Sequence, residues 1–155
     1  MPVVLFFLLC ISAFAQELTF NTGSDWELKK DLFGADYAVV YLETSNALLV
    51  KKMPADIANK DVESELKKEI EKKSKSQVPW VNSTIKSVQD IEWFPGKKGK
   101  LMTVEHLKKN IPHTSIVGIQ PLQKEHYFIF YSEETLQFVK HEKEVLALLK
   151  SIKGH

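Results

Sequence analysis

Apolar and polar residues alternate in several different ways along this chain, and each change predicts a new element. Residues 37–42 are almost entirely apolar and favour strands. A polar stretch follows at 43–46, and the apolar pattern returns at 47–53. Two such runs around a polar turn predict a β-hairpin. The segment before it, residues 26–33, fits either a short strand or an irregular stretch that ends at Gly34.

A helix is predicted over residues 61–76. Asp61 is a favourable helix cap, and Val62, Leu66 and Ile70 recur at every fourth position. Glutamates and lysines also follow one another at four-residue spacing, in the order that stabilises a helix. Because the apolar stripe is narrow, we expect this helix to lie on a sheet with most of its surface, lysines included, in water.

The second half of the chain predicts two more hairpins. Their strands are residues 88–94 and 100–108, joined by the turn 95–99, and residues 114–120 and 125–131, joined by the turn 121–124. Asn110, Ile111 and Pro112 break the chain between the two hairpins. These strands therefore predict an antiparallel meander.

Residues 135–152 predict a closing amphipathic helix, because their apolar side chains fall on one face. These side chains are Phe138, Val145, Leu149 and Ile152. The order of elements is then hairpin, helix, meander, helix, which differs from the regular alternation that produces parallel sheets. We therefore expect an α+β fold: one antiparallel β-sheet, made of a hairpin and a meander, with a charged middle helix and a C-terminal amphipathic helix packed on it. Residues 16–155 are expected to form a single domain.

A secretory signal peptide is predicted at residues 1–15. The apolar run at 3–11 is shorter than the roughly 20 residues that span a bilayer. The small-residue pattern Ala13-Phe14-Ala15 predicts cleavage before Gln16. The alternative is a buried N-terminal strand. We expect an exported protein, located in the periplasm or outside the cell.

Cysteine occurs once in the chain, at Cys10, inside the predicted signal peptide. The mature protein would then contain no cysteine, so it would form no disulfide and would depend on packing for its stability. A lipid anchor on Cys10 is a competing interpretation. It is disfavoured by Leu9, because lipoprotein processing sites carry a small residue at that position.

The charge composition limits the partners that the chain can bind. All 21 basic residues are lysines, and 20 carboxylates balance them to a net charge of +1. The chain therefore lacks the planar guanidinium that grips phosphate or guanine with two hydrogen bonds. We expect no nucleic-acid partner. Three lysines of one predicted turn, Lys97, Lys98 and Lys100, offer peripheral contact with an anionic membrane as an alternative.

The sequence shows no pattern typical of a metal or catalytic site. Its histidines are His106, His113, His126, His141 and His155, and none has another histidine at the short spacings that metal ligands use on helices or hairpins. His113-Thr114-Ser115 is the one close His/Ser group, and adjacent residues on a strand point to opposite faces. We therefore expect no metal, no cofactor and no enzymatic activity.

Two aromatic clusters are the candidate partner contacts. Trp93 and Phe94 are neighbours on a predicted strand, so one of the two rings points away from the core. Pro79 and Trp80 follow the charged helix, in a loop that we expect to be exposed. Exposed tryptophan and phenylalanine are typical anchors of protein interfaces, so these four residues predict a contact patch. The alternative is that both clusters pack over the ends of the sheet.

Several features together suggest a family. They are Trp26 before the first hairpin, the charged helix after it, the meander, and a closing pattern of Tyr131-Ser132, Phe138 and Leu149-Lys150-Ser151-Ile152. In these features the chain resembles the PsbP-like and DcrB-like exported domains, over nearly all of residues 16–153. The resemblance implies a binding or accessory role. It transfers no site residue to this chain.

Our first hypothesis is a small exported domain without enzymatic activity that binds another protein, in an accessory or inhibitor-like role. The alternative is a carrier of a small apolar ligand, held between the sheet and the helices. A hydrolase whose site leaves no trace in residue spacing is the third hypothesis. Asn82 starts a glycosylation sequon, which has meaning only if the source is eukaryotic.

Overall fold

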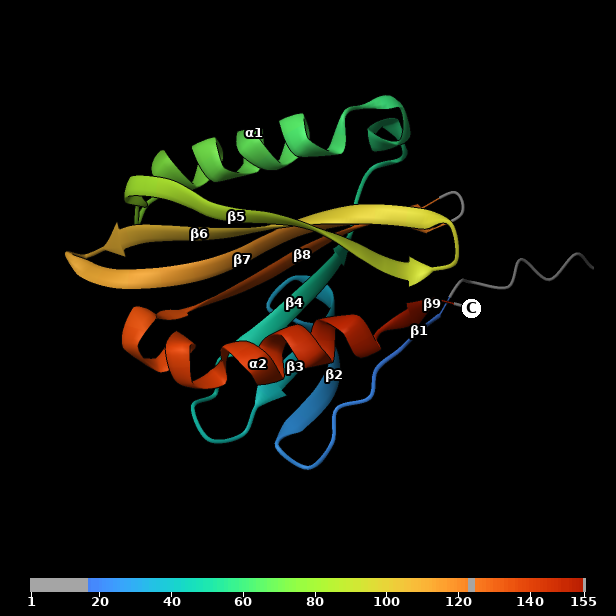
Figure 1. The fold of residues 1–155 in the computed structure, drawn as a ribbon, viewed down its shortest axis with the longest axis horizontal. Helices are drawn as coiled ribbons and strands as arrows, with labels where there is room; N and C mark the ends of the chain where they lie inside the picture. Colours follow the sequence, from blue (N-terminus) through green and yellow to red (C-terminus); the bar gives the residue numbers. More distant parts are fainter. Residues whose placement is uncertain (1–16, 123–124, 155) are drawn as a thin grey trace, which may run out of the picture.

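One helix covers each face of a long antiparallel sheet (Figure 1). The structure is a computed structural model, and it describes residues 17–122 and 125–154. The predicted signal peptide, with Cys10, lies outside the described residues, and so does His155. Among the helices of the described ranges, none has the length and apolar character needed to cross a membrane.

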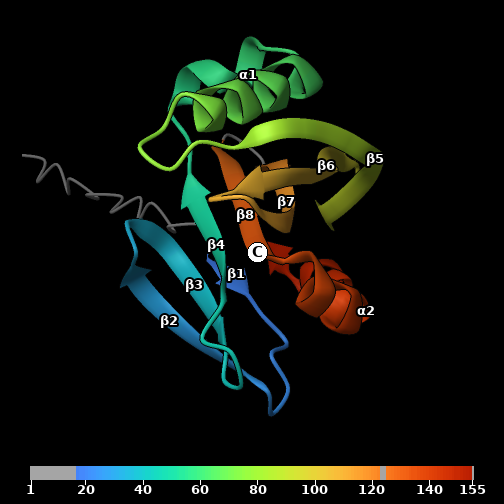
Figure 2. The ribbon, with the colours of Figure 1, turned by 90° about the vertical axis from the view of Figure 1, so that its left-hand side faces the viewer.

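The main sheet has seven strands, and every neighbouring pair in it is antiparallel. In spatial order the strands are β2 (Trp26–Leu32), β3 (Ala35–Tyr41), β4 (Ala47–Lys52), β8 (Glu125–Glu134), β7 (Ile111–Leu122), β6 (Lys97–Lys108) and β5 (Val81–Phe94). The pairing of β4 with β8 joins the first hairpin to the meander (Figure 2). A separate pair of short strands, β1 (Leu18–Thr19) and β9 (Lys153–Gly154), brings the two ends of the described chain together.

The helices lie where the sequence predicts them. α1 (Val62–Ser74) begins after Asp61, whose Oδ2 accepts a hydrogen bond from the N–H of Ser64 at 2.8 Å. α2 (Thr135–Ser151) closes the domain. A short 3-10 helix, η1 (Ala55–Asn59), connects β4 to α1. The fold is therefore α+β, as predicted.

Successive side chains along each strand point to opposite faces of the sheet, so the buried apolar side chains form two groups, one on each face. The α1 face buries Leu66, Ile70, Trp80, Met102, Val104, Val117 and Ile119. The α2 face buries a larger group that includes Trp93, Leu101, Ile129, Tyr131, Phe138, Val145 and Leu149. Leu101 and Met102 are adjacent in β6 and lie on opposite faces, so this strand contributes to both cores.

The first half of β5 differs from the prediction. The strand begins at Val81, well before the expected start at Val88. Residues 81–88 are all exposed, so they show no apolar alternation that local pattern analysis detects. Their pairing with β6, from Val81 opposite Leu107 onward, is what makes them a strand.

Two turns are also shorter than predicted. Pro95 and Gly96 alone connect β5 to β6, because Lys97 already pairs with Phe94. Lys109 and Asn110, both at positive φ (51° and 65°), connect β6 to β7. Residues 111 and 112 therefore belong to β7, although Pro112 led us to expect a break. Of the predicted turn at 121–124, the first two residues belong to β7 and the other two lie outside the described residues.

Candidate functional site at the turn between β2 and β3

The predicted aromatic patch is not exposed as expected. Trp80 is 5% exposed, so the expectation that it lies in an exposed loop is wrong. Of the neighbouring rings Trp93 and Phe94, Trp93 is the one that points into the core, at 1% exposure. The Nε1–H of Trp93 donates a hydrogen bond to the main-chain oxygen of Leu149 at 2.8 Å, which ties β5 to α2. Phe94 is half-buried against the α2 core, whereas Pro79 is exposed. Pro79 and the outer part of Phe94 are the portions of the predicted patch that a partner can reach.

The lysines of the predicted basic turn lie on a strand. Lys97 and Lys98 are exposed in β6. Lys100 forms an ion pair with Asp90 of β5 at 2.6 Å, and this pairing raises the pKa of Lys100 and lowers that of Asp90. One of the three lysines is therefore neutralised within the chain. Membrane contact through them stays a prediction.

Tertiary structure brings together a histidine and a serine that sequence spacing did not connect. His106 Nε2 lies 2.9 Å from Ser115 Oγ, and Ser115 donates in turn to Ser132 Oγ at 2.8 Å. Ser115 has no exposed surface, and the ring of Trp80 stacks on His106. His113 lies opposite His106 across β6 and β7, with ring centroids 5.8 Å apart. The closed surroundings of Ser115 indicate a structural role for this cluster, since a nucleophile must meet its substrate.

Metal binding finds no support in the described part of the chain. Within residues 17–122 and 125–154, no three His, Cys, Asp or Glu side chains are grouped so that they could hold a metal ion. The registers also separate His106 of β6 from His126 of β8 by the whole width of β7.

The turn between β2 and β3 presents an unusual aromatic residue. Leu32 pairs with Ala35, so Phe33 and Gly34 form the turn alone. Both residues have positive φ, 55° and 71°, which identifies a type I′ turn. The first position of that turn strongly favours asparagine, aspartate or glycine, because a bulky side chain is strained at positive φ. Phenylalanine there costs about 1–2 kcal/mol of backbone strain.

Contacts within the protein do not explain this strain. Phe33 is 69% exposed, one of the most exposed large apolar side chains in the described chain. Asp31, two residues earlier, also has a positive φ of 54°. The backbone around the turn is therefore held in a conformation that displays an aromatic ring to solvent.

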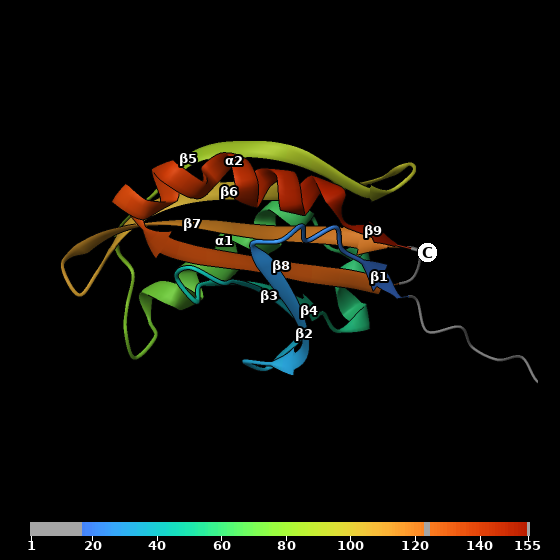
Figure 3. The ribbon, with the colours of Figure 1, turned by 90° about the horizontal axis from the view of Figure 1, so that it is seen from below.

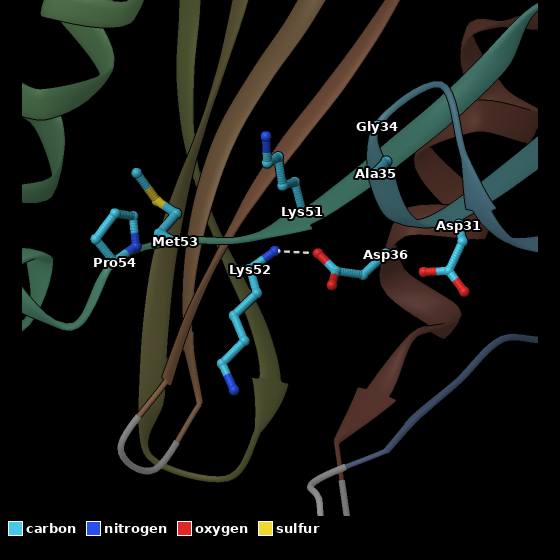
Figure 4. Close-up of a pocket in the computed structure, with 8 residues that line it drawn as sticks. All are labelled: Asp31, Gly34, Ala35, Asp36, Lys51, Lys52, Met53 and Pro54. Atoms are coloured by element: carbon cyan, nitrogen blue, oxygen red, sulfur yellow. Dashed lines mark hydrogen bonds between the residues drawn. The ribbon is translucent and has the colours of Figure 1, made fainter.

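A surface cavity of about 610 Å³ lies beside this turn. It is lined by Asp31, Gly34, Ala35, Asp36, Lys51, Lys52, Met53 and Pro54 (Figure 4). The main-chain N–H of Lys52 donates to Asp36 Oδ2 at 2.7 Å, which fixes the carboxylate against β4. Lys51 and Lys52 point to opposite sides of that strand. The walls of the cavity therefore combine charged and apolar residues, which come from β2, β3, β4, the turn at Gly34 and the two residues after β4.

Charges of both signs surround the cavity and the turn. Lys52 forms an ion pair with Glu125, and Lys30 forms one with Glu17 at 2.7 Å. The second pairing raises the pKa of Lys30 and lowers that of Glu17. The side chain of Lys51 makes no hydrogen bond or ion pair with any described residue. An exposed aromatic residue in a turn next to a cavity with charged walls is typical of a protein-binding surface, in which the aromatic ring is the anchor.

Sequence reasoning missed Phe33, although a signal was present. The pattern at residues 26–33 fits either a short strand or an irregular stretch that ends at Gly34, so it does not by itself place Phe33 and Gly34 in a turn. The apolar run at 37–42 needs an antiparallel neighbour, and a glycine between it and residues 26–32 marks the turn that such a neighbour requires. The turn is difficult to recognise from the sequence because Phe33 stands before Gly34, where a two-residue hairpin turn usually has asparagine or aspartate.

Comparisons with known proteins identify the fold. No protein-family model and no curated protein matches the chain. Among solved structures, it is similar to the cyanobacterial PsbP protein of Synechocystis, with a TM-score of 0.63 at 8% identity over 90% of this chain and 92% of that one. It is also similar to LpqN, involved in cell envelope biogenesis of Mycobacterium tuberculosis, with a TM-score of 0.60 at 9% identity over 90% and 84% of the two chains.

A third similar structure is PA94 of Pseudomonas aeruginosa, a protein of unknown function and putative regulator. Its TM-score is 0.53 at 9% identity, over 88% of this chain and 81% of that one. The chain therefore has a PsbP-like fold, as the sequence resemblance predicted. At these identities the comparisons establish the fold alone.

Proposed function

We propose that this chain is an exported accessory domain, without enzymatic activity of its own, that binds another protein through the turn between β2 and β3. One observation carries the proposal: Phe33 is 69% exposed at a φ of 55°. Strain of this kind persists where surrounding structure enforces it, and it concentrates at functional sites. Folding alone would favour asparagine at this position, so the ring has a use outside the fold.

The geometry of the turn suits an anchor residue. A buried phenylalanine at the centre of an interface contributes far more than its polar neighbours, whose main effect is to exclude water. Charged side chains line the cavity beside the turn: Lys51 is free to pair with a partner, and the carboxylate of Asp36 accepts a hydrogen bond from the N–H of Lys52. A rigid turn also loses little conformational entropy on binding.

The predicted secretory signal supports an accessory role in the cell envelope. The apolar run at 3–11 and the Ala13-Phe14-Ala15 pattern are typical of a secretory signal. One protein of similar fold, LpqN, is described as involved in cell envelope biogenesis. We extend that setting to this chain as part of the proposal.

The apolar-carrier hypothesis has no comparable support. The cavity beside the turn is lined by two aspartates and two lysines. The surface cavity beside β2 and α2 also contains charged side chains, Asp25 and Glu144. A carrier of an apolar ligand needs a mostly apolar pocket with few polar groups.

Site-specific photo-crosslinking in the native cell tests the proposal. A benzophenone side chain replaces Phe33 in one strain and Leu136 in a control strain, because Leu136 of α2 is 81% exposed. We expect a discrete protein adduct from position 33 and none from position 136. No adduct at position 33, or the same adduct from both positions, would overturn the proposal.

A further inference from the structure

Strand β5 forms one edge of the sheet, and no strand of the described chain pairs with its outer side (Figure 3). It is 14 residues long, twice the length of β2 at the opposite edge. Every second residue of an edge strand directs its N–H and C=O away from the sheet. β5 therefore displays a row of main-chain donors and acceptors that only an extended backbone can pair.

One part of this edge is regular enough to accept another strand. From Ser87 to Glu92 the pairing of β5 with β6 runs without a shift. Irregularities flank this stretch, one between Ile85 and Ser87 and one between Glu92 and Phe94. Such bulges limit edge-to-edge pairing, so the usable edge is the regular stretch itself.

Two charged side chains of this edge are already paired within the protein, and the Glu92 carboxylate accepts a hydrogen bond from the N–H of Gly96 at 3.3 Å. Lys86 lies 3.3 Å from Glu105, and Asp90 lies 2.6 Å from Lys100. An approaching backbone therefore meets no unpaired charge from these two residues. The opposite edge is less suitable, because Asp31 has positive φ and interrupts the regular path of β2.

A small cavity lies beside the edge, between α1 and β5. Its volume is about 240 Å³, and its lining is Lys67, Ile70, Glu71, Ser74, Ser83 and Ile85. The two isoleucines are its apolar part; Ile85 is 38% exposed and Ile70 is 8% exposed. A cavity of this size holds one aliphatic side chain. When a peptide binds by adding a strand to a sheet, pockets beside the edge strand bind individual side chains of the peptide and determine specificity.

We propose that β5 accepts an extended peptide segment of another protein as an added strand along Ser87–Glu92, with an aliphatic side chain of that segment in the cavity between Ile70 and Ile85. Ile85 is two residues before Ser87, about 7 Å along the strand, so one short segment reaches both features. This surface is on the opposite edge of the sheet from Phe33. The inference therefore stands independently of the proposed function.

The test starts from a phage-displayed library of random short peptides, selected on the folded protein that begins at Gln16. A selected peptide is then synthesised with one N-methyl group at each position in turn, and each version is titrated by fluorescence anisotropy. Strand addition predicts an alternating pattern, with about tenfold weaker binding at every second position and little change between them. An equal loss of binding at every N-methylated position would overturn the proposal, and so would a library that yields no binder.

A variant tests the cavity. Ser83 is exposed and lines the cavity, so S83W is expected to fill it and to weaken peptide binding about tenfold without lowering the thermal midpoint. L136W is the matched control on α2, and F33N is the control for the other surface; both are expected to bind the peptide normally. Unchanged binding by S83W at an unchanged midpoint would remove the cavity from the proposal.

A second copy of the chain is the competing occupant of the edge. Sedimentation equilibrium of the protein without peptide distinguishes it. A monomer supports the proposal. The contrary result is a dimer that dissociates in the S83W variant and on addition of the peptide. That result would show that β5 pairs with a second copy of the chain, and it would overturn the proposal.

Discussion

The ring of Trp80 stacks on the ring of His106, with centroids 3.8 Å apart and planes inclined by 10°. The two residues belong to different parts of the fold, since Trp80 follows α1 and His106 lies on β6. Both are buried, at 5% and 4% exposure. Burial lowers the pKa of His106 to about 4, so the imidazole is neutral where the protein is stable.

The first prediction concerns pH. The unfolded chain takes up a proton on His106 near pH 6.5, whereas the folded chain resists protonation down to about 4. Between these values the unfolded state binds more protons, so the free energy of unfolding falls as pH is lowered. We expect a loss of about 2 kcal/mol from this residue between pH 7 and pH 5, measured by urea unfolding.

The variant H106Q should flatten much of this pH dependence, because glutamine does not titrate. Burial also lowers the pKa of His126, which therefore contributes a smaller slope of the same sign that H106Q retains. An equal slope in H106Q and the parent would show that His106 is not responsible.

The second prediction separates stability from binding at Phe33. F33N places the preferred residue at the first position of the type I′ turn and relieves the strained φ of 55°. We expect the domain to gain about 1 kcal/mol, which raises its thermal midpoint by roughly 3–5 °C, and to lose capture of its partner. The control L136N should do neither. A less stable F33N would mean that the ring is held by contacts within the protein.

The third prediction concerns Trp80. An exposed ring would make W80A almost neutral, whereas the buried ring should cost about 3–5 kcal/mol. P79A changes the exposed neighbour and is expected to stay within about 0.5 kcal/mol of the parent. Thermal unfolding of both variants provides the measurement. A midpoint for W80A within a few degrees of the parent would place the ring outside the core.

The fourth prediction concerns the hydrogen bond from Trp93 to Leu149. W93F keeps the aromatic volume in part but leaves the carbonyl of Leu149 without its donor. We expect a loss of about 1–3 kcal/mol and faster amide hydrogen exchange at the C-terminal end of α2. Exchange at the N-terminal end of α2 is the internal control. Equal acceleration at both ends would indicate general loosening.

The fifth prediction concerns export. Protein isolated from its native compartment should begin at Gln16, as shown by intact mass. A13Q/A15Q removes the small residues that cleavage requires, so its product should retain residues 1–15. Parent protein that retains them would contradict the signal peptide.

The sequence alone determined the features that depend on neighbouring residues. The cap at Asp61, the four-residue repeat of α1 and the apolar face of α2 are local patterns, and each produced the predicted helix. The α+β class followed from the order of such elements. These features depend on short-range interactions. A capping side chain accepts a hydrogen bond from a residue about three positions later, and side chains of one helix face recur once per turn.

The candidate site depended on tertiary structure. Val81 to Ser87 form a strand because β6 pairs with them, and Trp80 is buried because His106 covers it from another element. Phe33 is exposed because its turn directs the ring away from both cores. A sequence pattern records which residues are apolar, but which surfaces stay open is decided by pairing between distant segments, whose contacts leave no local periodicity.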